Sequence, residues 1–389
     1  MSDTEPVTAR PPEARPVSAR SPEAEPVTAR PSEAEAAAEA VWTVTVPGPL
    51  PTRLDELVPP LEAAGCRVLR PPVPAAGEAF AWTDDEVARW IVPADALVGI
   101  FAGMRLDRAV LERAERVRVV TSPIIGTEHI DVAACTELGI VVAFGAVPEN
   151  IDGVAEAVVM LIAALRKQLP AKSAAVRDGG WRVPFAGNMV RGSTVGLVGL
   201  GAIGRATAAR LAGWDATLVG TDPFVSPAAA AEAGVELVGL DDLLARADVV
   251  SLAVTLSPET HHLIGARELA LMKPGSYLIN TARGGVVDEE ALLAALEDGH
   301  LAGAALDTWE AEGPGGSSPL RTHPQVIATG HNVGHSEELY DTHPRVAAES
   351  TLLALGGEPP RYVRNPEVLP AWRERCARLD AAAAAATSR

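Results

Sequence analysis

The chain contains 389 residues, which is enough for about two domains of ordinary size. Hydrophobic residues make up 48% of the sequence, so a sizeable core is available. The formal net charge of −18 argues against sequence-independent binding to nucleic acid and against docking on an anionic membrane.

The three cysteines, Cys66, Cys135 and Cys376, lie far apart and form neither a CxxC motif nor a cluster with histidines. They predict reduced, packed thiols and no metal site. The N-terminus has no apolar run that could form the core of a signal peptide, and nowhere are there eighteen uninterrupted apolar residues, as a membrane span requires. We therefore expect a cytoplasmic protein.

The two ends of the chain differ in composition from the rest. Residues 5–34 are three decamers, EPVTARPPEA, RPVSARSPEA and EPVTARPSEA, each with two or more prolines and no large apolar residue. Such a segment buries too little surface to offset its chain entropy, so residues 1–40 are expected to be a disordered tail; a docking role is the alternative. Residues 371–389 are expected to form a C-terminal tail that ends in a fraying helix.

Residues 41–149 alternate between short β-branched runs and helical patterns. The runs VWTVTVP, CRVLR, ALVGIFA, RVRVVTS and GIVVAFG are separated by stretches such as LDRAVLERAERV. Strand–helix alternation of this kind predicts a parallel sheet with helices on both faces.

The segment DGVAEAVVMLIAALRK at residues 152–167 is apolar nearly all round. A helix that is apolar on every face is buried, so we expect it to lie between domains or against another subunit.

A second strand–helix series lies within residues 150–334. It runs from STVGLVGLG through ATLVGTD, ADVVSLAV, GSYLINT and GAALDTW to QVIATG. The predicted fold class is therefore α/β, with two doubly wound parallel-sheet domains, Rossmann-like or flavodoxin-like, and a cleft between them.

The stretch GLGAIG at residues 199–204 follows an apolar strand and opens a helical pattern. Gly199 permits a tight turn, Gly201 lets the backbone approach a pyrophosphate, and Gly204 lets helix and strand pack closely. The helix N-terminus supplies free N–H groups to phosphates. Asp222, at the end of the next strand, would accept hydrogen bonds from ribose hydroxyls and repel a 2′-phosphate. The pattern predicts NAD rather than NADP, and a purely structural glycine turn is the alternative.

Side chains of complementary chemistry follow three consecutive strands of the second series. Arg283 comes after one strand, Asp307 and Glu312 after the next, and His331 after the third. The carboxyl ends of parallel strands share one edge of a sheet, where such sheets bind ligands. Arginine can hold a carboxylate through two hydrogen bonds, histidine can pass a proton near neutral pH, and a carboxylate can orient the imidazole. The set predicts hydride transfer involving a keto acid.

Together these stretches resemble the D-isomer-specific 2-hydroxyacid dehydrogenase family. The resemblance covers nearly all of residues 41–370 and rests on GLGAIG, LMKPGSYLINTARGG, LDTWEAE, GHNVG and RNPEVL, which stand in family order. It implies catalytic roles for Arg283, Glu312 and His331, and contact of Asp307 with the nicotinamide carboxamide. The cofactor contacts that it implies are at Gly199, Gly201, Ala202, Ile203, Gly204, Asp222, Thr281, Ala282, Arg283, Asp307 and His331.

The resemblance also implies a domain organisation. A substrate domain at residues 41–149 would be completed by residues 335–370, and residues 150–334 would form the NAD-binding Rossmann domain. The helix at residues 152–167 would then be an interdomain element and the contact of a homodimer.

Two assignments within these motifs have alternatives. His331 matches the family's acid–base histidine, whereas His335 falls at a variable position and either lines the pocket or is an exposed or helix-capping residue. Glu310 is the alternative to Glu312 as the supporting carboxylate. The other histidines have no carboxylate partner in a matching motif and are expected on the surface or in packing: His129, His261, His262, His300, His323 and His343.

The sequence departs from the family pattern at three places. Gly330 and Thr255 replace usual prolines, and the loop usually written AGVGVDN reads SPIIGTEHID at residues 122–131. In the family this loop offers backbone N–H groups to the substrate's acid group, but Pro123 has none and Ile124 replaces a glycine. The residues expected to contact the substrate are Ile124, Ile125, Gly126 and Arg283.

The expected function is an NAD-dependent oxidoreductase that transfers a hydride between NAD(H) and a small D-2-hydroxy acid or its 2-keto partner. A dehydrogenase of a phosphorus oxyacid and a non-catalytic, NAD-sensing scaffold of the corepressor type are the alternatives. Because residues 122–127 include no Lys or Arg, we predict a preference for one compact anionic head group. 3-Phosphoglycerate is therefore expected to be a poor substrate.

Overall fold

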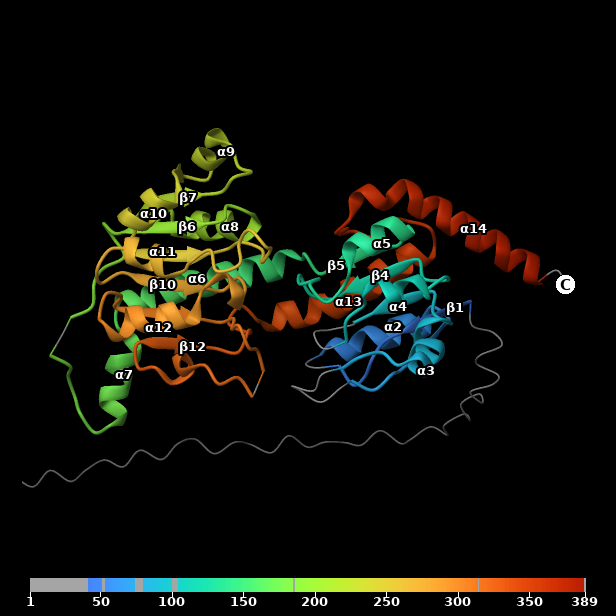
Figure 1. The fold of residues 1–389 in the computed structure, drawn as a ribbon, viewed down its shortest axis with the longest axis horizontal. Coiled ribbons are helices and arrows are strands. Elements are labelled where there is room, and N and C mark those ends of the chain that lie inside the picture. Colours follow the sequence, from blue (N-terminus) through green and yellow to red (C-terminus); the bar gives the residue numbers. More distant parts are fainter. Residues whose placement is uncertain are drawn as a thin grey trace, which may run out of the picture. The chain divides into compact units, whose positions relative to one another are not determined.

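The structure is a computed structural model and describes residues 41–50, 53–73, 80–99, 104–184, 186–313 and 315–387. The N-terminal repeats at residues 5–34, expected to be disordered, lie outside the described residues. Within the described residues the strands form two parallel sheets, each with helices on both faces, so the predicted fold class is confirmed (Figure 1).

The first sheet has the strand order β2-β1-β3-β4-β5, and every neighbouring pair is parallel. Its strands are β1 (Trp42–Thr45), β2 (Cys66–Leu69), β3 (Ala96–Val98), β4 (Val119–Ser122) and β5 (Val141–Phe144). Successive residues of a strand point to opposite faces, so Val119 and Val120 join different cores. Both faces are therefore apolar, which explains the uninterrupted β-branched runs of the sequence.

Different helices cover the two faces of this sheet. One face packs against η1 (Leu54–Leu57), α2 (Val58–Ala63), α13 (Glu337–Leu355), η5 (Pro366–Val368) and α14 (Leu369–Thr387). The other packs against η2 (Val87–Ile91), α4 (Arg108–Glu112) and α5 (Val132–Leu138), with α3 (Asp84–Glu86) directly before η2.

The C-terminal residues differ from the expected tail. Residues 371–387 belong to α14, and Trp372 is fully buried in the first core, where its indole N–H donates to the carbonyl of Arg118 at 3.0 Å. Arg375 is also buried and donates to several carbonyls, including that of Val117 at 2.8 Å. The first turns of α14 are thus part of the domain, because a tryptophan and an arginine with buried partners hold them there.

The second sheet has the order β12-β11-β10-β9-β6-β7-β8, again all parallel. Its strands are β6 (Thr194–Val198), β7 (Thr217–Thr221), β8 (Glu236–Leu237), β9 (Val249–Leu252), β10 (Tyr277–Asn280), β11 (Gly303–Leu306) and β12 (Val326–Ala328). The chain builds outward in both directions from β6 and β9, and the carboxyl ends of such a pair are where open α/β sheets bind ligands.

The helices of the second sheet also divide between its faces. The core on one face includes residues of α10 (Leu240–Arg246), α11 (Ala266–Leu271) and α12 (Glu289–Glu297), and that on the other includes residues of α6 (Pro148–Arg166), α8 (Ala202–Leu211) and α9 (Pro227–Glu232). The remaining elements are α7 (Leu169–Arg177), η3 (Gly284–Val286) and η4 (Pro319–Thr322).

The chain passes between the two sheets at the start of α6 and again before α13. These passages touch at Gly153 and Gly334, where a Cβ on Gly153 would lie 2.2 Å from the carbonyl oxygen of Gly334. One helical turn away, Thr342 donates to Glu149 at 3.1 Å. Helix α6 is less uniformly buried than its composition predicts, because Met160 on it is 54% exposed.

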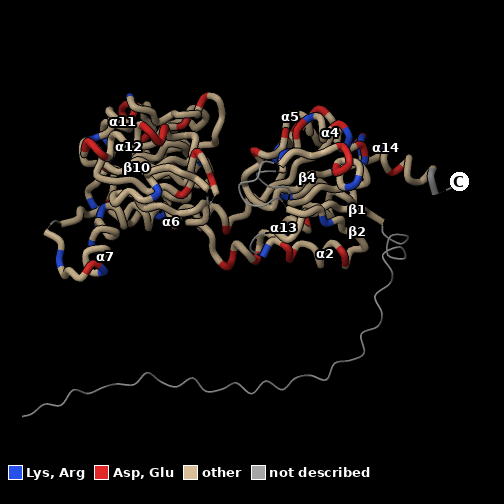
Figure 2. Tube along the Cα trace, turned by 60° about the horizontal axis from the view of Figure 1, so that its bottom comes forward, with Lys and Arg blue, Asp and Glu red and all other residues tan. Residues whose placement is uncertain are grey.

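Positive and negative charges are mixed in the part of the chain that the structure describes. Figure 2 shows basic and acidic residues interspersed along the described chain. Among the described helices, none has both the length and the apolar character that crossing a membrane requires. The three cysteines are all free and buried.

Candidate active site

The glycine stretch at residues 199–204 joins the carboxyl end of β6 to the start of α8. Gly199 has a φ of +98°, and a Cβ there would lie 2.5 Å from the carbonyl oxygen of Ala253. A Cβ on Gly204 would lie 2.1 Å from the carbonyl oxygen of Gly199, so the helix packs directly on the turn. A Cβ on Gly201 would meet no atom within 4 Å, which leaves its backbone open to a ligand.

The surroundings of this turn fit a dinucleotide. The first N–H groups of α8 have no partner within the helix, and no side chain caps them, so they can donate hydrogen bonds to a phosphate. From the end of β7, Asp222 accepts hydrogen bonds from the N–H of Leu200 at 2.9 Å and of Phe224 at 2.8 Å. These bonds fix the Asp222 carboxylate beside the turn, where ribose hydroxyls would reach it.

His331 and Glu312 form a hydrogen-bonded pair. The Nδ1 atom of His331 lies 2.9 Å from Oε1 and 3.1 Å from Oε2 of Glu312, and both side chains are partly exposed. Burial raises the pKa of Glu312, but the hydrogen bond and charge of His331, together with the charge of Arg283, outweigh it and hold that pKa below its ordinary value. Nε2 of His331 makes no hydrogen bond within the described part of the chain, so it is the nitrogen free to exchange a proton.

Asp307 fixes the loop that presents His331. Its Oδ1 atom accepts hydrogen bonds from Thr329 Oγ1 at 2.6 Å, from the N–H of Asn332 at 3.0 Å and from the N–H of Val333 at 3.1 Å. The N–H of His331 donates to the backbone carbonyl of Asp307 at 2.7 Å. His331 itself has a φ of +58°, a conformation that only such surrounding bonds maintain in a non-glycine residue. These bonds hold the loop although Gly330 replaces the usual proline.

Glu310, the alternative carboxylate, has a different partner. Its Oε1 atom lies 2.8 Å from Nε2 of His262, and its N–H donates to Glu289 at 2.7 Å. His262, expected on the surface or in packing, thus has a carboxylate partner that no motif predicted. His335 lies 3.0 Å from the hydroxyl of Tyr340 through its Nδ1 atom, and Ser336 caps α13 in its place.

Arg283 follows β10 in a turn shaped by a buried asparagine. Asn280 accepts from the N–H of Ala282 at 3.0 Å and donates to the carbonyl of Arg283 at 2.9 Å. The guanidinium donates from Nη1 to the carbonyl of Ala282 at 2.7 Å and from Nε to Glu128 at 2.8 Å. Thr281 is the other residue of this turn. The contact with Glu128 was not predicted, because 155 residues separate the two in sequence.

The loop expected to bind the substrate, at residues 122–131, follows β4. Ser122 donates from Oγ to the carbonyl of Gly126 at 2.8 Å, and the N–H of Gly145 donates to the carbonyl of Ile124 at 2.9 Å. These two carbonyls of the loop thus have partners within the protein. The N–H groups of Ile124, Ile125 and Gly126 have no hydrogen-bond partner among the residues that the structure describes, so they remain available to an acid group.

Arg321 braces the segment that carries Glu312. Its guanidinium stacks over Trp309 at 5.1 Å and donates to the carbonyls of Gly313 at 2.8 Å and Ala311 at 2.6 Å, on either side of Glu312. The indole N–H of Trp309 donates to the carbonyl of Thr329 at 2.8 Å and so links this segment to the His331 loop. Arg321 belongs to none of the motifs found in the sequence, and its role is visible only in the structure.

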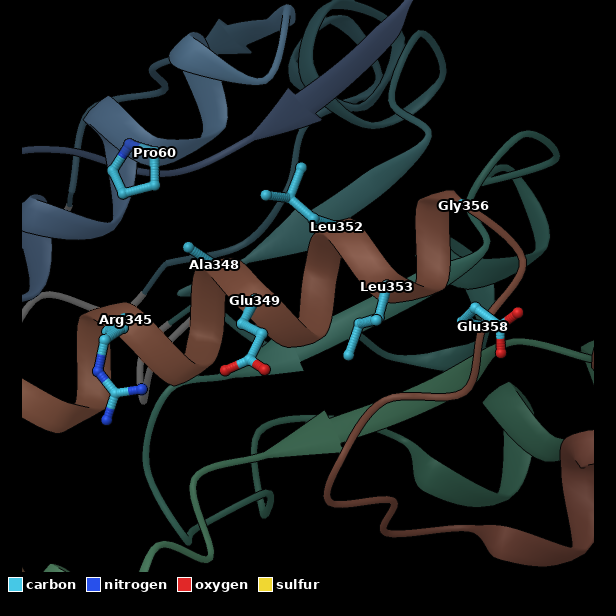
Figure 3. Close-up of a pocket in the computed structure, with 8 residues that line it drawn as sticks. All are labelled: Pro60, Arg345, Ala348, Glu349, Leu352, Leu353, Gly356 and Glu358. Carbon is cyan, nitrogen blue, oxygen red and sulfur yellow. The ribbon is translucent and has the colours of Figure 1, made fainter.

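Two pockets are candidates for the location of the active site. One of about 450 Å³ lies beside the histidine pair and is lined by Trp309, Glu312, Gly313, Arg321, Ala328, Thr329, Gly330 and His331. A larger groove of about 610 Å³ runs along α13 and is lined by Pro60, Arg345, Ala348, Glu349, Leu352, Leu353, Gly356 and Glu358 (Figure 3). The groove contains none of the predicted catalytic side chains, whereas the smaller pocket is lined by two of them, Glu312 and His331.

Comparison with known proteins agrees with the geometry. Residues 159–333 match the sequence profile of the "D-isomer specific 2-hydroxyacid dehydrogenase, NAD binding domain". This segment is therefore an NAD-binding domain, as predicted.

Similar proteins extend the match over most of the chain. A D-3-phosphoglycerate dehydrogenase of Mycobacterium bovis is 41% identical over 282 residues, which cover 71% of this chain and 53% of that protein. A glyoxylate reductase of Thermofilum pendens is 37% identical over 298 residues, covering 73% of this chain and 85% of that protein. The solved structure of a D-lactate dehydrogenase from Treponema pallidum is 26% identical with a TM-score of 0.65, covering 82% of this chain and 99% of the other.

The chain spans about half the length of the phosphoglycerate dehydrogenases that it matches. The glyoxylate reductase, in contrast, is matched over most of its length. The chain therefore belongs to the D-isomer-specific 2-hydroxyacid dehydrogenase family.

Proposed function

We propose that this protein is an NAD-dependent oxidoreductase that interconverts a small D-2-hydroxy acid and its 2-keto partner. The observation that carries the proposal is the His331–Glu312 pair, at the carboxyl edge of the sheet that also carries the glycine turn. The positive charge of Arg283 contributes to the lowered pKa of Glu312, which supports an anion-binding group near the His331–Glu312 pair.

The residues divide the chemistry between them. NAD held by residues 199–204 and Asp222 would supply the carbon that accepts or donates the hydride. In oxidation, Nε2 of His331 takes the proton of the substrate hydroxyl, while Glu312 at Nδ1 stabilises the imidazolium that forms. In reduction, His331 returns this proton to the carbonyl oxygen. Arg283 binds the acid group and polarises the adjacent carbonyl.

The substrate loop supports a preference for one anionic head group. The open N–H groups of Ile124, Ile125 and Gly126 offer hydrogen bonds to one acid group, and no basic residue stands at residues 122–127 to neutralise a second. We therefore propose a short monoacid such as glyoxylate, pyruvate or D-glycerate as the substrate class. A cytoplasmic location and a homodimer through residues 152–167 stay predictions.

A coupled assay tests the proposal directly. The purified chain is mixed with NADH and glyoxylate, pyruvate or hydroxypyruvate, and in the other direction with NAD and D-lactate, D-glycerate, 3-phosphoglycerate or phosphite. We expect turnover of at least one monoacid, a higher kcat/KM for D-glycerate than for 3-phosphoglycerate, and no turnover of L-lactate, the stereochemical control. Turnover of phosphite alone would identify a phosphorus oxyacid dehydrogenase. Binding of NADH without any turnover would identify a sensing scaffold.

A further inference from the structure

The predicted substrate anchor already binds a carboxylate of the protein. Nε of Arg283 donates to Oε1 of Glu128 at 2.8 Å, and the two side chains are 26% and 52% exposed. Glu128 belongs to the loop that is expected to bind the substrate. It therefore occupies Arg283 at the place where the substrate is expected to bind. This contact joins the two parts of the proposed site.

The contact limits how a substrate can reach Arg283. A guanidinium has one hydrogen on Nε and two on each Nη atom. The Nε hydrogen is used by Glu128, and one Nη1 hydrogen is used by the carbonyl of Ala282. A substrate carboxylate can therefore bind end-on through Nη1 and Nη2, but side-on binding through Nε and Nη2 requires Glu128 to leave.

Glu128 also brings a negative charge to the substrate position. Burial raises the pKa of Glu128, but the charge and hydrogen bond of Arg283 outweigh it and hold that pKa below its ordinary value. The carboxylate is therefore ionised at neutral pH. A Cβ on Gly126 would lie 2.8 Å from Oε2 of Glu128 and 3.0 Å from Nη2 of Arg283. The carboxylate of Glu128 and the guanidinium of Arg283 thus both lie next to Gly126.

We infer that Glu128 is a specificity-determining residue: its carboxylate occupies one side of Arg283 and selects monoanionic 2-keto acids over dianionic ones. This inference rests on the proposed function, since it assigns Arg283 to the substrate's acid group. An ion pair of this exposure contributes little to stability, so a substrate can displace Glu128 at small cost. A second negative charge on the ligand would lie beside the Glu128 carboxylate and be repelled by it.

The test compares two non-reducible ligands of similar size and different charge. Oxamate carries one negative charge at neutral pH and oxalate carries two. Their Kd values for the enzyme with NADH bound are measured from the quenching of NADH fluorescence, in the full chain and in Glu128→Gln. The control Glu236→Gln removes a carboxylate from the surface pair with Arg246. NADH affinity and circular dichroism verify that each variant is folded.

In Glu128→Gln we expect oxamate to bind about threefold to fivefold more tightly. The ratio of the oxalate Kd to the oxamate Kd should fall about tenfold, because the repulsion of the second charge is removed. Glu128→Ala should also lower the oxamate Kd and the ratio of the oxalate Kd to the oxamate Kd. Glu236→Gln should change neither quantity. An unchanged ratio in both Glu128 variants, with folded protein, would overturn the inference.

The proposed function can fail separately. If the ratio falls as expected but no 2-keto acid is reduced, Glu128 is a selectivity residue of a binding protein. If 2-keto acids are reduced while the ratio does not change, the oxidoreductase stands and the role of Glu128 falls.

Discussion

The loop that presents His331 and the loop that ends at Glu128 depart from their family pattern in opposite ways. In residues 329–333 a usual proline is missing, yet three hydrogen bonds to the Asp307 carboxylate and one to its backbone carbonyl hold the loop. In residues 122–128 glycine is replaced and a proline is added, and three N–H groups are left without a partner among the described residues. We therefore expect the protein to fix its proposed proton-transfer group by itself and to leave its proposed acid-binding loop to be completed by a ligand. Substitutions in the first loop should cost more activity than those in the second.

The largest effect is expected for His331→Asn. Asparagine tolerates the left-handed backbone at this position, so the variant removes the imidazole without straining the loop. Turnover should fall by about 10²–10⁴-fold with unchanged NADH affinity, since this is what general acid–base catalysis contributes. Steady-state kinetics and NADH fluorescence measure the two quantities. The control His335→Asn should keep most of its activity. An inactive His335→Asn together with an active His331→Asn would assign the acid–base role to His335 instead.

A smaller effect is expected for Glu312→Gln. The lowered pKa of Glu312 means that the wild-type pair is intact above that pKa and is lost only as the pH falls through it. The variant lacks the charged partner at every pH, so keto-acid reduction should fall by roughly a hundredfold, and the decline in activity as the pH falls through the pKa of Glu312 should be absent from its profile. The pH profile of kcat/KM measures this. Glu310→Gln, which affects the partner of His262, should leave the profile in place.

A substitution outside both loops tests the cofactor side. Asp222→Asn removes the charge that repels a 2′-phosphate but keeps a hydrogen-bond acceptor for the N–H of Leu200. The ratio of kcat/KM for NADPH to that for NADH should rise by roughly tenfold. Asp241→Asn, in a surface pair with Arg267, is the matched control. A wild type that already prefers NADPH would contradict the role given to Asp222.

The smallest effect is expected for Pro123→Ala, which adds one N–H group to the acid-binding loop. Because the loop already offers three N–H groups, KM for the keto acid should fall only about twofold to threefold, with kcat unchanged. Pro227→Ala, at the start of α9, controls for the loss of a proline elsewhere. A hundredfold change on Pro123→Ala would show that this loop is as constrained as the His331 loop.

Local sequence patterns predicted the strands and the glycine turn. Residues such as Gly199 and Gly204 are recognisable because their spacing reflects a turn that only glycine permits. Asp307 was assigned to the cofactor, but its bonds to the His331 loop could not be read from the sequence, since an aspartate after a strand looks the same whichever group it binds. The contacts of Glu128 with Arg283 and of Trp372 with Arg118 join residues more than 150 positions apart, and no local pattern encodes them.

The meeting of Gly153 and Gly334 has a mechanical consequence. Two segments that connect the same pair of domains can lie apart from each other. Here they touch at a point where neither residue has a side chain, and a Cβ on Gly334 would lie 2.6 Å from a methyl group of Val154. The two connecting segments therefore pack directly against each other at one point, and an alanine at either glycine would push them apart.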